Sequence, residues 1–183
     1  ENESPGSTAI SASAKRGLTL FRSLECGHCH GGFNFSDSTR TADAPHAAPV
    51  FHNTGLYNIT NTDGSPNNYP RFNQGVFERS GTAADKGKMR APTLRNIALT
   101  APYNHDGSTA TLSEVLDNYA RGGRFVSSPP ARFGDGANNA NKDTRAHSFT
   151  LSAAEKADLL EFLNSLTDQA FVSDPALSDP FAP

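Results

Sequence analysis

The chain has 183 residues, with 16 lysines and arginines against 19 aspartates and glutamates, so its formal net charge at pH 7 is −3. This length fits one domain, or at most one and a half. The near-neutral charge argues against a nucleic-acid partner and against binding to an anionic membrane surface. No apolar run in the sequence approaches the ~18 residues of a membrane span. The first residues lack a signal-peptide pattern, and we interpret them as a mature or trimmed start.

The first predicted helix runs from about Ser11 to Leu24. Ser11 is a residue type that caps helix N-termini. Ala14, Leu18 and Phe21 follow at the spacing of one helical face. This pattern predicts an amphipathic helix at the start of the domain.

Two capping boxes predict two further helices. The second helix begins at Thr111, with Glu114 three residues later, and ends at Gly122. The third opens with Ser152 and Glu155 in the same arrangement. Apolar faces are formed by Leu112, Val115, Leu116 and Tyr119 in the second helix and by Leu159, Leu160, Leu163 and Leu166 in the third. The expected fold class is therefore all-α, with three main helices.

Long segments without periodicity separate these helices. Residues 31–90 and 122–149 are rich in Gly, Asn, Pro and Ser. Loops of this length usually serve a site or wrap a ligand. Pro92 suits the first position of a short helical turn. We expect an N-terminal extension over residues 1–10, one domain over 11–170 and an extended surface tail over 171–183.

The strongest chemical signal is the run Cys26-Gly27-His28-Cys29-His30, a C-x-x-C-H motif. Two thiols three residues apart, followed by an imidazole, are the requirements for attaching a c-type haem. Each thiol adds to one vinyl group of the haem, and His30 becomes the proximal iron ligand. A structural zinc site normally needs a second pair of ligands, and the chain has only these two cysteines. A thioredoxin-like dithiol needs a βαβ context, which the pattern lacks. The motif therefore predicts one covalent haem c and a periplasmic location, where such attachment takes place.

The ligand at the sixth position of the iron decides the function of such a protein. Met89 is the only methionine of the chain and the natural choice for an electron carrier. Tyr119 lies on the apolar face of its predicted helix, with a hydroxyl that needs a partner. The other candidates are the histidines His46, His52, His105 and His147. Spacing alone does not choose between Met89 and Tyr119.

Several segments carry a family resemblance. Residues 90–96 (RAPTLRN), 99–107 (LTAPYNHDG) and 111–116 (TLSEVL) resemble the C-terminal half of bacterial di-haem cytochrome c peroxidases. Three further segments resemble the MauG side of this family, and in particular its MbnH-like branch. They are residues 51–56 (FHNTGL), 119–123 (YARGG) and 177–181 (LSDPF).

The resemblance implies a fold and a ligand set. The fold is a class I cytochrome c-like domain around one haem c, bound covalently by Cys26 and Cys29. Family members of the electron-transfer type have a methionine as the distal ligand, whereas MauG-type members have a tyrosine. That position is Tyr119 here, so the resemblance implies that His30 and Tyr119 bind the haem iron, with Tyr119 as the catalytically important ligand.

The resemblance also implies roles for four residues outside the motif. Arg95 and His105 fall in segments that line the haem edge; for Arg95, a surface ion pair is the alternative. Family members bind a calcium ion between their two haems, partly through backbone oxygens that correspond to Thr100 and Pro102. Carbonyl and water oxygens suit a hard cation of this kind.

The chain departs from the family in carrying one C-x-x-C-H motif instead of two, and it has no tryptophan. The implied N-terminal half, or a separate subunit, would hold the second haem and react with hydrogen peroxide. We therefore expect a redox module that stores an oxidising equivalent at a His/Tyr-ligated haem. By long-range electron transfer it would oxidise an aromatic residue of a partner protein. The alternative is a mono-haem electron-transfer cytochrome c with His30 and Met89 as ligands.

Overall fold

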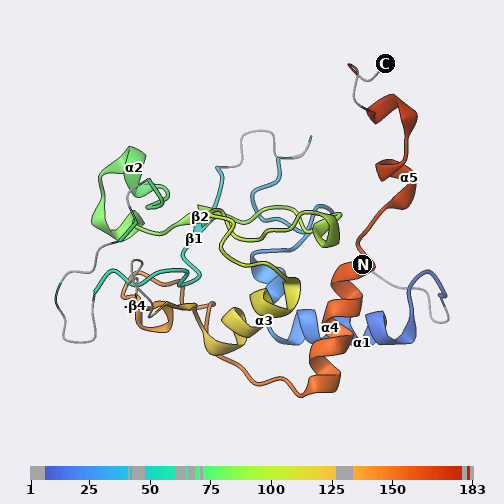
Figure 1. Ribbon diagram of the computed structural model, residues 1–183, viewed down its shortest axis with the longest axis horizontal. Coiled ribbons are helices and arrows are strands. Elements are labelled where there is room, and N and C mark those ends of the chain that lie inside the picture. The colour runs from blue at the N-terminus through green and yellow to red at the C-terminus, as the bar shows by residue number, and fades with distance from the viewer. Residues whose placement is uncertain are drawn as a thin grey trace.

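The computed structural model describes residues 7–40, 42, 48–60, 65, 69–70, 72–126, 134–178 and 181. Three helices dominate these residues: α1 (Ala12–Ser23), α3 (Leu112–Arg121) and α4 (Ala153–Asn164). They gather at one end of the molecule, while the irregular loops and the short helix α2 (Phe77–Ser80) form the other end (Figure 1). The fold is thus mostly helical, and long loops extend from a small helical core.

The three predicted helices are confirmed, together with the residues that start them. The Ser11 side chain accepts a hydrogen bond from the backbone N–H of Ala14, at 3.1 Å. Both predicted capping boxes close reciprocally, one between Thr111 and Glu114 and the other between Ser152 and Glu155. Each box satisfies N–H groups that a helix start leaves without an intrahelical partner.

The core lies where α1 crosses α4. Its buried residues are Phe21, Leu94, Leu116, Leu159, Phe162 and Leu163. Arg16 of α1 binds the carboxylate of Asp158 in α4 through two hydrogen bonds of 2.7 Å each. Gly17 lies at the crossing itself, because its missing side chain leaves room for the backbone of α4. The two helices therefore approach more closely than any larger residue at position 17 would permit.

Phe35 connects this core to the loop that follows the C-x-x-C-H motif. Its ring lies 6.3 Å from that of Phe21 and 6.1 Å from that of Phe162, with near-perpendicular edge contacts. Edge-to-face aromatic pairs of this kind add to the stabilisation that burial provides. The loop is thereby fixed to the helices within five residues of His30.

The remaining elements are short. They are the helix α5 (Gln169–Val172) and the 3₁₀ turns η1 (Cys26–His28), η2 (Ala83–Asp85), η3 (Ile97–Leu99), η4 (Gly136–Asn138) and η5 (Pro175–Leu177). Two antiparallel ladders pair β1 (Phe51–His52) with β2 (Met89–Arg90) and β3 (Phe125–Val126) with β4 (Gly134–Asp135).

These short elements differ from the all-α expectation. The ladders form because loop segments lie side by side and satisfy each other's backbone groups. The helical turn expected at Pro92 occurs instead as η3, since the Thr93 hydroxyl accepts a hydrogen bond from the Arg95 N–H in a local turn. The segment expected as an extended tail contains η5 and part of α5, and its described residues are exposed. The expected domain boundaries stay a prediction.

Buried polar side chains hold the loops together. The Asn53 side chain donates to the carbonyl of Lys86 and accepts from the N–H of Gly55, and Asn139 donates to the carbonyl of Tyr57. Among the described residues, every buried side-chain nitrogen or oxygen has a hydrogen-bond partner. No helix in the described ranges is long and apolar enough to cross a membrane.

Replacing Gly17 with alanine tests the helix crossing. Alanine has a higher helix propensity by about 1 kcal/mol. However, its Cβ would lie 2.0 Å from the carbonyl oxygen of Asp158 and 2.7 Å from the Cβ of Phe162. Overpacking of this kind costs about 1–3 kcal/mol, so we expect Gly17→Ala to lower the free energy of unfolding. Thr19→Ala, on the exposed face of the same helix, is the matched control and should change it by less than about 0.5 kcal/mol. Equal stability of the two variants in chemical denaturation would contradict the close crossing.

Candidate functional site

The C-x-x-C-H motif forms a tight turn directly after α1. Glu25 adopts a left-handed backbone conformation (φ 62°) that ends the helix and starts η1. The backbone N–H groups of Cys29 and His30 both donate to the carbonyl of Cys26, the latter at 2.9 Å. A Cβ on Gly31 would lie 2.4 Å from the carbonyl oxygen of Gly27, so the chain leaves the turn through a position that only glycine fits. The turn brings the two thiols and the imidazole onto one short stretch of backbone.

One nitrogen of the His30 ring is hydrogen-bonded to the backbone. Its Nδ1 lies 3.2 Å from the carbonyl oxygen of Phe35, and a carbonyl accepts only from a protonated nitrogen. Burial lowers the pKa of His30, and the backbone groups of Phe35 and Pro92 and the charge of Asp37 oppose this only in part. The ring is therefore neutral at pH 7, with Nε2 free of a proton, which is the form that binds a metal.

Both cysteines are free thiols in partly buried positions. Burial raises the pKa of Cys26 to about 11, and burial together with the charges of Asp37 and Asp143 raises that of Cys29 to about 11. The thiols are therefore protonated near neutral pH and form no disulfide. Two thiols and a neutral imidazole in one turn are the donors that a c-type haem requires.

Tyr119 lies in the last turn of α3, facing the same region. Burial, with smaller contributions from the nearby sulfur atoms of Cys26 and Cys29, raises the pKa of its hydroxyl to about 12. Both cysteines that would attach the haem therefore lie within electrostatic range of this hydroxyl. The side chain borders a small hollow whose other lining residues are Thr54, Leu56, Asn104, Val115, Asn118 and Arg124.

The other candidate iron ligands lie in different surroundings. Met89 is in β2, paired in register with His52, and its methyl group lies beside Gly75. His105 and His147 are exposed. His46 lies outside the described residues.

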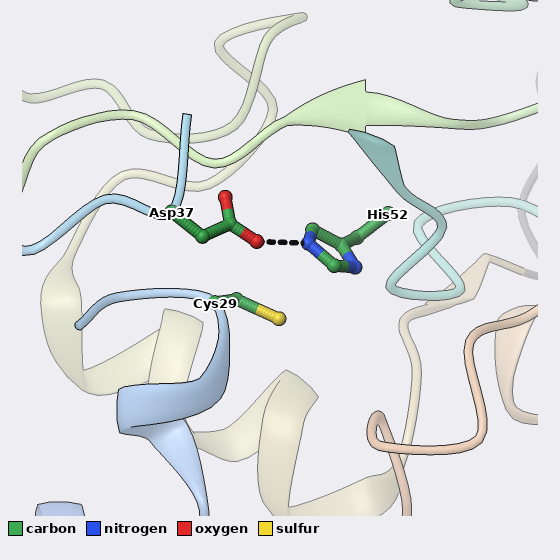
Figure 2. A group of neighbouring side chains, drawn as sticks. All are labelled: Cys29, Asp37 and His52. Carbon is green, nitrogen blue, oxygen red and sulfur yellow. Dashed lines mark hydrogen bonds and ion pairs between the residues drawn. The ribbon is translucent and has the colours of Figure 1, made fainter. Parts of the chain in front are cut away.

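His52 is engaged elsewhere. Its Nε2 lies 2.5 Å from Asp37 Oδ2 and its Nδ1 lies 2.7 Å from Asp143 Oδ2, so both ring nitrogens are occupied (Figure 2 shows the first pair). The imidazole is only 8% exposed. The sequence identified His52 only as a candidate ligand, because nothing in the pattern connects it with a carboxylate 91 residues later. We name Asp37, His52 and Asp143 the carboxylate–histidine cluster.

A second polar group surrounds Tyr57. Its hydroxyl donates to the carboxylate of Asp106, and the Arg124 guanidinium lies 4.9 Å from the centre of its ring. Arg124 also approaches Asp106 at 3.6 Å. His105, predicted to line the haem edge, lies with its ring centre 6.2 Å from that of Tyr57. The structure thus places His105 against this group, and its role toward a haem stays a prediction.

Arg95 contacts the chain just beyond the motif. Its Nε and Nη2 donate to the carbonyl of Phe33 at 3.2 and 2.7 Å, and its guanidinium stacks on the Phe33 ring at 4.2 Å. The pairing is with a carbonyl and an aromatic face, and differs from the surface ion pair that was the alternative. The haem-edge role of Arg95 also stays a prediction.

The two residues predicted to bind calcium follow η3. Thr100 and Pro102 are exposed, and neither carbonyl oxygen accepts a hydrogen bond from the described part of the chain. The Thr100 hydroxyl donates to the carbonyl of Ile97 at 3.0 Å and so points back into its own turn.

Comparisons with known proteins identify relatives that are longer than this chain. No family model matches it. It is 31% identical over 186 residues to the cytochrome-c peroxidase IdrP1 of Pseudomonas sp. (strain SCT), with 93% of this chain and 43% of the relative covered. It is 30% identical over 172 residues to the methylamine utilization protein MauG of Methylorubrum extorquens, with 93% and 39% covered. The chain thus spans less than half the length of these curated relatives.

Solved structures that resemble this chain come from the same kind of protein as its sequence relatives. A MauG-like protein associated with microbial copper homeostasis is 45% identical with a TM-score of 0.86, covering 94% of this chain and 52% of that chain. The diheme peroxidase BthA from Burkholderia thailandensis E264 has the same fold, at 23% identity and a TM-score of 0.54, covering 89% and 44%. The family implies haem c, in agreement with the C-x-x-C-H motif. By sequence and by fold, the chain belongs to the cytochrome c peroxidase/MauG family.

Proposed function

We propose that this chain is the electron-storing haem module of a MauG-type, MbnH-like di-haem oxidoreductase. Cys26 and Cys29 would attach one haem c in a class I cytochrome c-like arrangement of α1, α3 and α4. His30 would bind the iron on one side and Tyr119 on the other. The 45% identity to a MauG-like protein, over 94% of the chain, supports this branch of the family over a simple electron carrier.

The observation that carries the proposal is the position of Tyr119. Its side chain is half-buried, and its hydroxyl lies within electrostatic range of Cys26 and Cys29, which both raise its pKa. By contrast, the methyl group of Met89 packs beside Gly75, next to the paired strands β1 and β2. Tyr119 is therefore the better candidate for an iron ligand opposite His30.

The ligand type determines what the module does. When bound, the haem supplies one-electron redox chemistry. A thioether ligand favours reduced iron, whereas a phenolate is anionic and favours oxidised iron. A tyrosine stays protonated near pH 7 when its pKa is about 12, so on binding Tyr119 would have to release its proton to water, which the positive charge of the metal would favour by lowering this pKa. His30, neutral and oriented by the Phe35 carbonyl, needs no such change.

The whole enzyme would need more than these residues. With both axial positions filled, this site is suited to storing an oxidising equivalent from hydrogen peroxide and not to binding the peroxide. A second haem-bearing half, in the same protein or in a separate subunit, would bind the peroxide. The final electron donor would be an aromatic side chain of a partner protein, and the assembly would be periplasmic.

We also propose a calcium ion at the backbone oxygens of Thr100 and Pro102. Calcium normally gathers six to eight oxygen ligands. Two exposed carbonyls supply only part of this shell, so waters and the second half of the enzyme would have to complete it.

Covalent attachment is tested by intact mass and acid-acetone extraction of the protein produced in a periplasm. One haem should remain bound to the chain after extraction. Cys26→Ala should sharply lower the yield of haem-bearing chain, because one of two thioether bonds is lost. His28→Ala is the matched control, since this residue lies inside the motif with a side chain that is 56% exposed. Haem that extracts from the native chain would contradict the assignment.

The distal ligand is tested by the ferric absorption and electron paramagnetic resonance spectra. Tyr119→Phe should change both spectra strongly, because it removes the phenolate. Met89→Leu should leave them unchanged and cost less than about 1.5 kcal/mol of stability. The reverse outcome would identify a His/Met electron-transfer cytochrome, which is the alternative function.

The proposed storage role, with peroxide binding in a second half, is tested with hydrogen peroxide. The haem-loaded chain alone should react slowly, because no open iron position is available. Adding the second haem-bearing half should increase the rate of peroxide consumption by at least tenfold. Rapid, stoichiometric oxidation of the isolated chain would contradict a storage role.

A further inference from the structure

The carboxylate–histidine cluster is a buried charged group that the proposed iron ligands do not use. Both ring nitrogens of His52 lie within hydrogen-bond distance of carboxylate oxygens, at 2.5 Å from Asp37 and 2.7 Å from Asp143. Ionised carboxylates only accept hydrogen bonds. Two such contacts therefore require a proton on each nitrogen, and His52 is an imidazolium held between two carboxylates.

The elements around the cluster supply one further fixed charge. The Arg145 guanidinium lies 3.7 Å from the other oxygen of Asp143. With His52 charged, the two carboxylates face two cations and the local charge is balanced. From the motif, the protonated Cys29 thiol and the neutral His30 ring also face this region and carry no charge.

The cluster lies against one attachment point of the haem. One oxygen of Asp37, one nitrogen of His52 and the sulfur of Cys29 all lie within 4.8 Å of one another. Figure 2 shows the Cys29 sulfur pointing toward the Asp37–His52 pair. Three such ligand atoms could also hold a metal ion, but a Cys29 sulfur committed to a thioether is no longer a thiolate ligand.

We propose that the carboxylate–histidine cluster is the proton partner of the haem, which takes up a proton when the haem gains an electron and releases it when the haem loses one. On oxidation, one electron leaves the haem for an electrode or a redox partner, and one proton leaves the His52 imidazolium for water. Reduction reverses both transfers. A positive charge beside the haem favours the reduced state, so by reciprocity reduction strengthens proton binding at His52.

The direction of the effect follows from the burial of His52 and its partners. Burial lowers the pKa of His52, but the hydrogen bonds that its ring donates to Asp143 and Asp37 outweigh this effect, and the net pKa lies above its ordinary value. His52 is therefore charged below this raised pKa and loses its proton as the pH rises through it. The reduction potential should accordingly be highest at low pH and fall across this window.

The test is a spectroelectrochemical titration of the haem-loaded chain between pH 5 and pH 10. The potential of the native chain should fall as the pH rises, and His52→Gln should lose most of this dependence. His147→Gln removes one exposed imidazole and is the matched control, which should keep the native profile. A His52→Gln profile that matches the native one, or a native potential that does not change with pH, would overturn the proposal.

A second variant covers the case in which His52→Gln fails to fold. Asp143→Asn keeps the imidazole but removes one negative charge, so it should shift the pH window of the potential to lower pH. An unshifted window would overturn the proposal. A purely structural cluster would lower the melting temperature of the variants and leave the potential–pH profile unchanged.

This inference rests on the haem attachment proposed above. Different results would contradict the proposed function and the proton-partner role. Haem content is measured first by intact mass. A missing covalent haem contradicts the proposed function, whereas an unchanged profile on a haem-bearing chain contradicts the proton partner.

Discussion

The contact of Phe35 with the helical core fixes the chain around the C-x-x-C-H turn. Its ring packs against Phe21 and Phe162, while its carbonyl receives the hydrogen bond from His30. One residue thus connects the packing of α1 and α4 to the orientation of the imidazole. Phe35 is partly buried, so it contributes less than the ~1.5–3 kcal/mol of a fully buried phenylalanine, but this orientation is stabilised by the same packing that folds the domain. Loss of the aromatic contact would free the imidazole as well as loosen the core.

The end of the molecule away from the helices depends on polar contacts. Its ladders are two residues long, and buried asparagines, together with His52, join segments that are far apart in sequence. Such networks are stable only when every member has a partner, because an unpaired buried polar group costs about 1–3 kcal/mol. The described residues meet this condition. Contacts of this kind are also what can hold the charged groups of the carboxylate–histidine cluster in place next to the C-x-x-C-H motif.

The sequence predicted the parts of the structure that depend on local signals. Capping boxes at Thr111 and Ser152 act within four residues, so they can be identified without knowledge of the fold. The motif at Cys26 is equally local. The carboxylate–histidine cluster and the Tyr57–Asp106 pair could not be predicted, because they join residues 91 and 49 positions apart. The contact of Arg95 with a carbonyl was missed for a related reason, since no pattern identifies which backbone group lies nearby.

The pairing of Arg95 with Phe33 has a consequence for any molecule that approaches the motif. Phe33 is 76% exposed, and a free phenylalanine on a surface loop would sample several rotamers. Here the guanidinium stacks on the ring and also binds the carbonyl of the same residue. The aromatic surface that Phe33 presents is therefore ordered before contact, and an incoming protein would lose little conformational entropy in packing against it.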